Sequence, residues 1–192
     1  MSTSTAPRLE IVPEDTPNPL SHKFTLNRTL LQGRGRDFAS LDSASASVLA
    51  QEMFRLPGVK GIYVGENFVT VSVNPGSDWW TLHPLIIQTL ETFVGSGAPM
   101  FEETNGSGAS AAEAPKFSVI EAGIIRVLEN EIQPAVAMDG GHIAFVGYEN
   151  GIVRVQLRGA CHSCPSSTVT LKMGIETRLK QEFPEIVAVE AV

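Results

Sequence analysis

Both cysteines of the chain lie in one short stretch, Gly159-Ala160-Cys161-His162-Ser163-Cys164-Pro165-Ser166-Ser167. Two thiolates three positions apart can bind one metal centre, but iron–sulfur clusters and structural zinc ordinarily require four ligands. The stretch therefore supplies half of a metal site. Either a second copy of the chain supplies the other half, or the two cysteines form a redox dithiol that needs no metal.

The residues on both sides of this stretch predict a strand before it and a helix after it. An alternation of apolar and polar residues over Ile152–Arg158 is typical of a strand, and Asn150-Gly151 joins it to an earlier apolar run at His142–Tyr148. Asn-Gly between two such runs is a strong β-hairpin signal. After the cysteines, apolar residues at helical spacing predict a helix that Pro184 closes, with the stripe Thr168, Leu171, Ile175 and Leu179.

A further helix is predicted upstream of the hairpin. Ser118 and Glu121 have capping-box spacing, and apolar residues then recur every four positions to Ile132. Pro134 disturbs the end of this helix, and Asp139-Gly140-Gly141 stops it. With a last strand at 186–192, the order of elements becomes α-β-β-α-β.

The position of the cysteines at a strand-to-helix junction favours thiolates. The start of a helix offers unpaired amides and the positive end of its dipole, which lower the pKa of a thiol. A thioredoxin-like dithiol uses the same physics, but there an aromatic residue usually precedes the motif and a proline lies inside it. Here Ala160 precedes the motif, Pro165 follows it, and the hairpin upstream is not the expected β-α-β unit. Metal or cluster binding is therefore favoured, and a thiol–disulfide oxidoreductase remains the alternative.

Zinc is a second alternative, because His162 lies inside the motif and His142 begins a nearby strand. Adjacent Cys161 and His162 would be strained if they bound one ion together, and His142 has no supporting metal spacing. We therefore assign neither histidine a ligand role.

The segment 97–116 is rich in glycine, serine and alanine, which is typical of a flexible linker. It separates a domain at 1–96 from a domain at 117–192, each small and of mixed α and β content. For the first domain we predict extended segments at 8–12, 23–27, 59–64 and 68–73, a turn at Thr16-Pro17-Asn18-Pro19, and helices at 46–55 and 79–93. Asp78 is expected to cap the second helix, and Trp79, Trp80 and Phe93 are expected in the core.

Composition restricts the function classes. Apolar residues make up 43% of the chain, which is enough for a buried core, and the net charge of −7 argues against nucleic-acid binding. Apolar stretches are too short to span a bilayer, and the first twenty residues match neither a signal nor a transit peptide. No arrangement of catalytic residues can be argued from the sequence. We expect a non-enzymatic protein of the cytoplasm.

Five motifs occur in order over the region 120–192: Asp139-Gly140-Gly141, Leu157-Arg158-Gly159-Ala160-Cys161, Cys164-Pro165-Ser166-Ser167, Thr170-Leu171-Lys172 and Phe183-Pro184-Glu185. With these motifs the region closely resembles the NifU C-terminal-like (Nfu) domain. The upstream region resembles the N-terminal domain of Nfu proteins. It shares Thr16-Pro17-Asn18-Pro19, Lys23-Phe24, Leu56-Pro57-Gly58-Val59, Phe68-Val69-Thr70-Val71 and Trp80.

This resemblance implies an iron–sulfur cluster carrier. Cys161 and Cys164 of two protomers would jointly hold one [4Fe-4S] cluster in a homodimer. The cluster would come from an upstream scaffold and pass to client apo-proteins. The same resemblance admits a [2Fe-2S] form as well. Mitochondrial members of the family carry a targeting presequence that the first residues here do not match, so the resemblance favours a protein of the bacterial cytoplasm.

Overall fold

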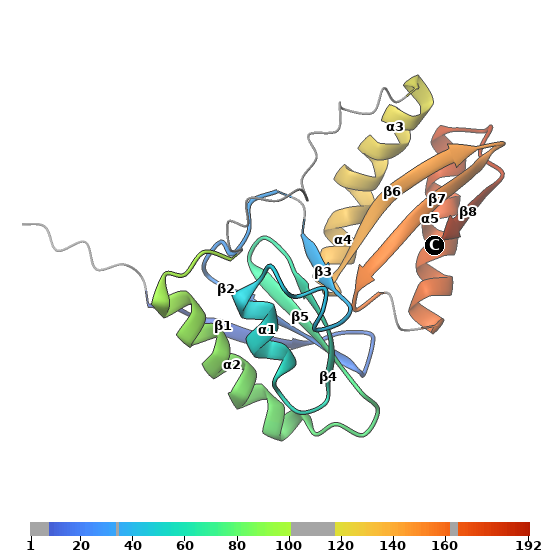
Figure 1. The fold of residues 1–192 in the computed structure, drawn as a ribbon. Coiled ribbons are helices and arrows are strands. Elements are labelled where there is room, and N and C mark those ends of the chain that lie inside the picture. Colours follow the sequence, from blue (N-terminus) through green and yellow to red (C-terminus); the bar gives the residue numbers. More distant parts are fainter. Residues whose placement is uncertain (1–7, 34, 101–117, 162–164) are drawn as a thin grey trace, which may run out of the picture. The chain divides into compact units, whose positions relative to one another are not determined.

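A computed structural model describes residues 8–33, 35–100, 118–161 and 165–192 (Figure 1). Contacts divide the chain into two compact units, of which the first comprises Met1–Asp15 and His22–Glu102 and the second comprises Thr16–Ser21 and Glu103–Val192. Helices and a sheet occur in each unit, which confirms the predicted α+β class. Most of the predicted linker at 97–116 lies outside the described residues.

The first sheet has five strands in the order β1-β2-β5-β4-β3. The strands are β1 (Ile11–Asp15), β2 (Ser21–Leu26), β3 (Arg36–Phe38), β4 (Val59–Val64) and β5 (Phe68–Val73). Antiparallel pairing joins β1 to β2, β3 to β4 and β4 to β5. Every residue of the central strand β5 is buried, so this strand forms the middle of the core.

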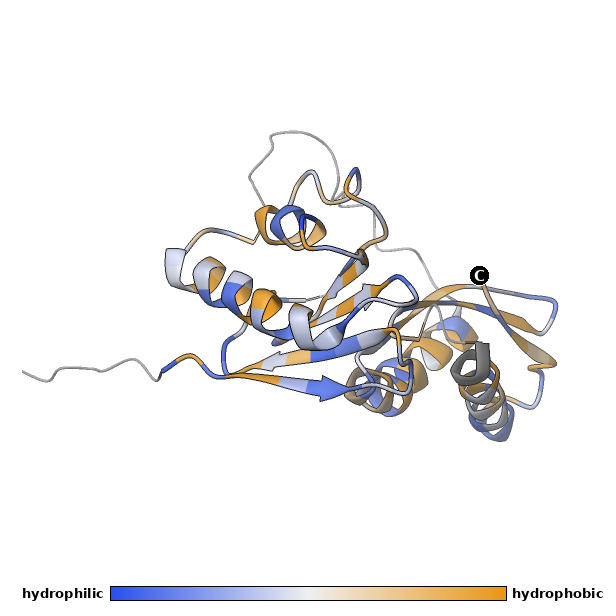
Figure 2. Ribbon diagram, turned by 90° about the horizontal axis from the view of Figure 1, so that it is seen from below, coloured by the Kyte–Doolittle hydropathy of each residue, from blue (hydrophilic) through white to orange (hydrophobic). Residues whose placement is uncertain are grey.

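Two helices, α1 (Val48–Phe54) and α2 (Trp79–Ser96), pack into the same apolar core as this sheet. Asp78 caps α2 as predicted, because its carboxylate accepts the N–H groups of Trp80 and Thr81 at 3.1 and 3.2 Å. Gly97 ends the helix with a φ of 64°. Both helices show apolar and polar segments in alternation, as expected of helices with one buried side (Figure 2).

The second sheet has three strands in the order β6-β7-β8. β6 (Gly141–Glu149) and β7 (Ile152–Gly159) form the predicted antiparallel hairpin, and Asn150 and Gly151 turn the chain with φ values of 51° and 78°. α5 (Pro165–Glu182) then leads to β8 (Ala188–Ala191), which pairs with β7 in parallel. Ile175 and Leu179 of α5 are buried, as the sequence stripe predicted.

The helical region before β6 ends where the sequence predicts but is less regular than expected. The Ser118–Glu121 capping box is present, and α3 (Val119–Val127) follows it. A π-helical segment, η1 (Leu128–Ile132), then leads to α4 (Gln133–Met138), which ends at its cap residue Asp139 as predicted. Pro134 lies in the first turn of α4, where no i→i−4 donor is required, so the disturbance predicted at the proline takes the form of a π segment just before it.

Three details of the first unit differ from the sequence-based expectations. No strand is predicted at the position of β3, because three residues give no periodicity to detect. The first strand begins at Ile11, later than expected, because its register is fixed by pairing with β2, where Ile11 lies opposite Leu26. Trp80 was expected in the core but is 91% exposed, since it lies on the outer side of α2.

Candidate functional site

Cys161 lies immediately after β7, at the junction with the helix, as the sequence predicts. It is only 5% exposed and belongs to the apolar core of the second unit. The other predicted ligand, Cys164, lies outside the described residues together with His162 and Ser163. Helix α5 begins at Pro165, so Cys164 directly precedes the first helical residue. A thiolate next to a helix start benefits from the amides and dipole there.

Gly141 provides the space that the Cys161 sulfur occupies. A Cβ atom at position 141 would collide with Sγ of Cys161, and it would also lie 3.1 Å from Cγ1 of Val136 and 3.2 Å from the carbonyl oxygen of Arg158. The hairpin register places Gly141 opposite Gly159 and so brings the first residue of β6 beside the cysteine loop. Sequence analysis assigned Gly140-Gly141 only the role of ending a helix. The glycine pair therefore has a second role, because Gly140 takes a φ of 73° and Gly141 accommodates the sulfur.

The backbone of Ala160, the residue before Cys161, is held on both sides. Its N–H donates to the carbonyl of Gly140 at 3.2 Å. Its carbonyl accepts a hydrogen bond from Nδ2 of Asn18 at 3.1 Å. Asn18 is 3% exposed and belongs to the turn Thr16–Ser21, which is part of the second unit. Sequence analysis predicted this turn but did not connect it with the cysteines.

The described residues contain no group of three or more histidine, cysteine, aspartate or glutamate side chains that could hold a metal ion. His142 lies opposite Arg158 in the β6–β7 pairing and is partly buried. A zinc site built from Cys161 and His142 would therefore lack a third ligand within this part of the chain.

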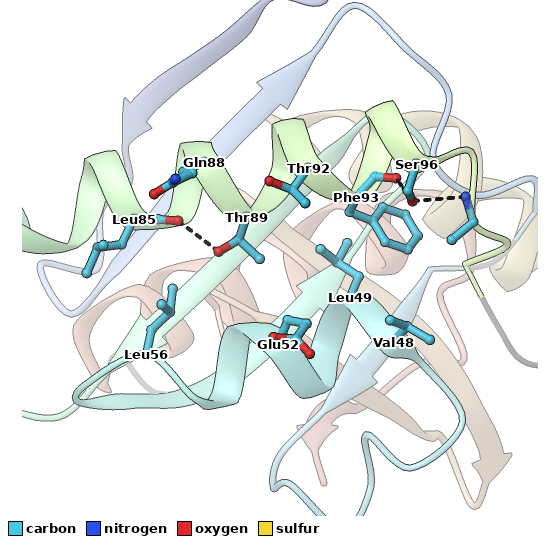
Figure 3. Close-up of a pocket in the computed structure, with 11 residues that line it drawn as sticks. Val48, Leu49, Glu52, Leu56, Leu85, Gln88, Thr89, Thr92, Phe93 and Ser96 are labelled. Atoms are coloured by element: carbon cyan, nitrogen blue, oxygen red, sulfur yellow. Dashed lines mark hydrogen bonds between the residues drawn. The ribbon is translucent and has the colours of Figure 1, made fainter.

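The first unit has a groove between α1 and α2 with a volume of about 470 Å³ (Figure 3). Its lining is mostly apolar and hydroxylic, with Leu49, Leu56, Leu85, Thr89 and Phe93 among its residues. Glu52 is its one ionisable side chain, and Glu52 pairs with Arg55. No thiol or imidazole is among the residues that line the groove.

A histidine pair in the first unit was not foreseen from the sequence. Nδ1 of His22 and Nε2 of His83 share a hydrogen bond of 2.8 Å, and the His22 ring stacks on Trp79 with centroids 3.9 Å apart. Burial, and then the neighbouring His83, hold the pKa of His22 below its usual range, while Asp15 opposes this shift. The two histidines are distant in sequence, and no local pattern relates a strand residue to a helix residue in this way.

No helix within the described ranges is both long and apolar enough to cross a membrane.

The fold and the cysteine loop define a two-unit α+β protein with a Cys-x-x-Cys pair between a hairpin and a helix. Residues 124–190 match the model of the NifU-like domain, and residues 11–97 match that of the Nfu/NifU N-terminal scaffold protein. The chain belongs to the Nfu family of NifU-like proteins.

Curated relatives cover both domains. The chain is 41% identical over 180 residues to the Homo sapiens protein named NFU1 iron-sulfur cluster scaffold homolog, mitochondrial, a match that spans 93% of this chain and 70% of the human one. It is 39% identical to the Drosophila ananassae protein of the same name, spanning 98% of this chain and 66% of the fly protein, which is just under two thirds. A solution structure of a NifU-like protein from Saccharomyces cerevisiae aligns with a TM-score of 0.45 and 22% identity, over 54% of this chain and 92% of the yeast chain.

Proposed function

We propose that this protein is a non-enzymatic iron–sulfur cluster carrier in which Cys161 and Cys164 of two copies bind one [4Fe-4S] cluster for delivery to apo-proteins. The proposal rests on the number of thiolate ligands that each chain provides. Two thiolates are available in each chain, and the described residues offer no further ligand group. A four-thiolate cluster is therefore completed by a second copy. The human and fly relatives named as iron–sulfur cluster scaffolds support the same class of cargo.

The site has properties that suit a cargo rather than a permanent cofactor. A cluster held between two copies has ligands from each, so it can leave when the copies separate. Cys161 is fixed by its packing against Gly141, whereas Cys164 directly precedes the positive end of α5. We assign cluster binding to the domain at 117–192, connection to the linker at 97–116, and contact with the cluster donor or clients to the domain at 1–96.

Anaerobic reconstitution with iron and sulfide tests this proposal. We expect about four iron atoms per dimer, with the visible absorption and Mössbauer spectra of a [4Fe-4S] cluster. The spectra of a [2Fe-2S] cluster would show that the protein binds that smaller cluster instead. Cys161→Ser and Cys164→Ser should each abolish stable binding. Ser163→Ala is the matched control, because it changes the same loop without removing a thiol. Normal iron content in either cysteine variant would overturn the bridged site.

The alternative of a thiol–disulfide oxidoreductase is tested with the same protein. A carrier should transfer its cluster to a model apo-ferredoxin and show no disulfide reductase turnover with a thiol reductant. Turnover that requires both cysteines, in protein that fails to retain iron, would favour the oxidoreductase.

The cellular location also needs a direct test. Sequence analysis predicts the bacterial cytoplasm, whereas the human and fly relatives are named mitochondrial. Fractionation of the source cells, with an antibody to the endogenous protein, decides between these compartments.

A further inference from the structure

Asn18 lies in a turn that is organised by its own side chains. The Thr16 hydroxyl lies 3.0 and 2.7 Å from the carbonyl oxygens of Asn18 and Ser21, and it accepts the N–H of Asn18 at 3.2 Å. Oδ1 of Asn18 accepts the N–H of Leu20 at 3.1 Å. Prolines on both sides of Asn18 restrict the backbone further. The Asn18 amide group is therefore oriented before it makes any longer-range contact.

Both protons of this amide have acceptors. Nδ2 lies 3.2 Å from Oγ of Ser21 and 3.1 Å from the carbonyl oxygen of Ala160. Ser21 is fully buried and Asn18 is 3% exposed, so these hydrogen bonds are shielded from water. A buried amide that loses an acceptor, or a buried carbonyl that loses its donor, is destabilised by desolvation. Breaking the hydrogen bond to Ala160 would therefore destabilise the folded state.

The carbonyl of Ala160 belongs to the same planar peptide group as the nitrogen of Cys161. This peptide plane also contains the Cα atom of Cys161. A hydrogen bond that fixes the Ala160 carbonyl therefore also restricts the orientation of the Cys161 side chain. The N–H of Ala160 is fixed separately by Gly140. With both bonds in place, the Cys161 sulfur lies against Gly141 and the residue is 5% exposed.

We propose that Asn18 is a positioning residue for Cys161, and that its hydrogen bond to Ala160 limits access to the Cys161 sulfur and slows loss of a bound cluster. The part about the cluster rests on the proposed function. The part about sulfur access concerns the apo-protein and does not depend on it.

Asn18→Asp separates the hydrogen bond to Ala160 from the shape of the turn. The carboxylate is nearly the same size as the amide and keeps an oxygen to accept the Leu20 N–H. It can no longer donate to Ala160 or to Ser21, but the Ser21 hydroxyl can turn and donate to the carboxylate, so the Ala160 carbonyl is the group that loses its partner. Asn27→Asp is the matched control. The Asn27 amide also donates to a backbone carbonyl, that of Arg8 at 2.8 Å, and it accepts the N–H of Glu10 at 3.0 Å, but it is exposed and distant in sequence from the cysteines.

The first measurement is the rate of iodoacetamide alkylation of Cys161 and Cys164 in the reduced apo-protein, followed by peptide mass spectrometry. We expect N18D to increase the Cys161 rate roughly fivefold to tenfold, as for the loss of one buried hydrogen bond, with a smaller change at Cys164. N27D should leave both rates unchanged. An unchanged Cys161 rate in folded N18D would overturn the proposal, and so would an equal rise at both cysteines, which indicates general unfolding.

The second measurement is the rate at which an iron chelator removes the cluster from reconstituted protein. N18D should lose its cluster several-fold faster than wild type and N27D. If wild-type protein binds no cluster, the proposed function fails, while the alkylation result still decides the role of Asn18. If N18D does not fold, Asn18→Gln keeps the donor amide one methylene out of place, and the same two rates test it.

Discussion

At the scale of single residues, the site depends on a glycine as much as on a cysteine. The Cys161 sulfur occupies the space where any other residue at position 141 would carry its Cβ. Two of the atoms crowding that space, Cγ1 of Val136 and the carbonyl oxygen of Arg158, belong to a buried core residue and to the backbone of β7. Neither can move away as the end of a flexible side chain can.

Gly141→Ala should therefore destabilise the second unit by about 1–3 kcal/mol, as for an overpacked core, and lower the iron content after reconstitution. Gly147→Ala in the same strand is the control, because a Cβ there has no neighbour within 4 Å. Hydrogen exchange of β6 and β7 in increasing urea measures the stability. Equal stability of the two variants would show that the Cys161 loop can shift without cost.

The partly buried pair His22–His83 makes the stability of the first unit depend on pH. The pKa of His22 is lowered in the folded state, mainly by burial and then by His83, so the unfolded state binds its proton more readily. The free energy of unfolding should be highest above the ordinary histidine pKa of about 6.5, where His22 is neutral in both states. It should decrease as the pH falls toward the lowered pKa, because the unfolded state then binds the proton more readily.

Both tryptophans lie at the start of α2, so their fluorescence reports unfolding of this unit. We expect wild type to lose more stability than His22→Gln between pH 7.5 and pH 5.5 in urea titrations. If the free energy of unfolding changed equally with pH in both proteins, the prediction that the pKa of His22 is lowered would be wrong.

At the scale of helices and strands, most elements could be predicted from local chemistry. Asn150-Gly151 fixed the hairpin because both residues can adopt positive φ. Asp78 and Ser118 marked two helix starts because each side chain accepts N–H groups there. The π segment η1 and strand β3 could not be predicted, because one depends on how the helix packs and the other on pairing with β4.

The capping box of α3 permits a direct test at this scale. Oγ of Ser118 accepts the N–H of Glu121, and the Glu121 carboxylate accepts the N–H of Ser118. Ser118→Ala should lower the stability of the second unit by about 1 kcal/mol. Thr177→Ala is the control, since its hydroxyl only bonds the carbonyl of Met173 within α5 and should be close to neutral. A similar loss in both variants, measured by urea unfolding, would contradict the capping role.

At the scale of the whole molecule, the sequence indicated the candidate ligands but not their surroundings. Cys161 and Cys164 were identifiable from spacing alone. The roles of Gly141 and Asn18 depend on contacts between segments far apart in the chain, such as the bond from Asn18 to Ala160. No periodicity or motif spacing reports such contacts.

A fragment that begins near residue 117 should still bind the cluster, because all thiolates of the chain lie within it. The fragment lacks Asn18, so its cluster should be lost to a chelator faster than that of the full chain. Its transfer to clients should also be slower if the first domain recruits them. Iron content and chelator kinetics after reconstitution measure the first two effects. Failure of the fragment to bind iron, despite a folded circular dichroism spectrum, would place part of the site outside it.

Dimerisation should depend on the cluster, because a ligand that binds only the associated state shifts the equilibrium toward it. Anaerobic size-exclusion chromatography with light scattering should show the holo-protein as a dimer and the chelator-treated protein as mostly monomer. Cys164→Ser should be monomeric under both conditions. A dimer that persists in the apo-protein and in this variant would mean that another surface drives association.

The π segment η1 has a consequence for insertions and deletions among relatives. Ile124 and Val136 are both buried, but their spacing would place them about 120° apart on a regular α-helix, where each residue turns by about 100°. The wider turn of η1 absorbs one residue and returns both side chains to the core. A relative with one residue fewer between 128 and 132, and no proline at the position of Pro134, can keep the same core with an unbroken α-helix. The same gap within α5 would instead turn every later side chain away from its partners. A one-residue gap is therefore tolerable at η1. A relative with such a gap in α5 must have different core residues after it.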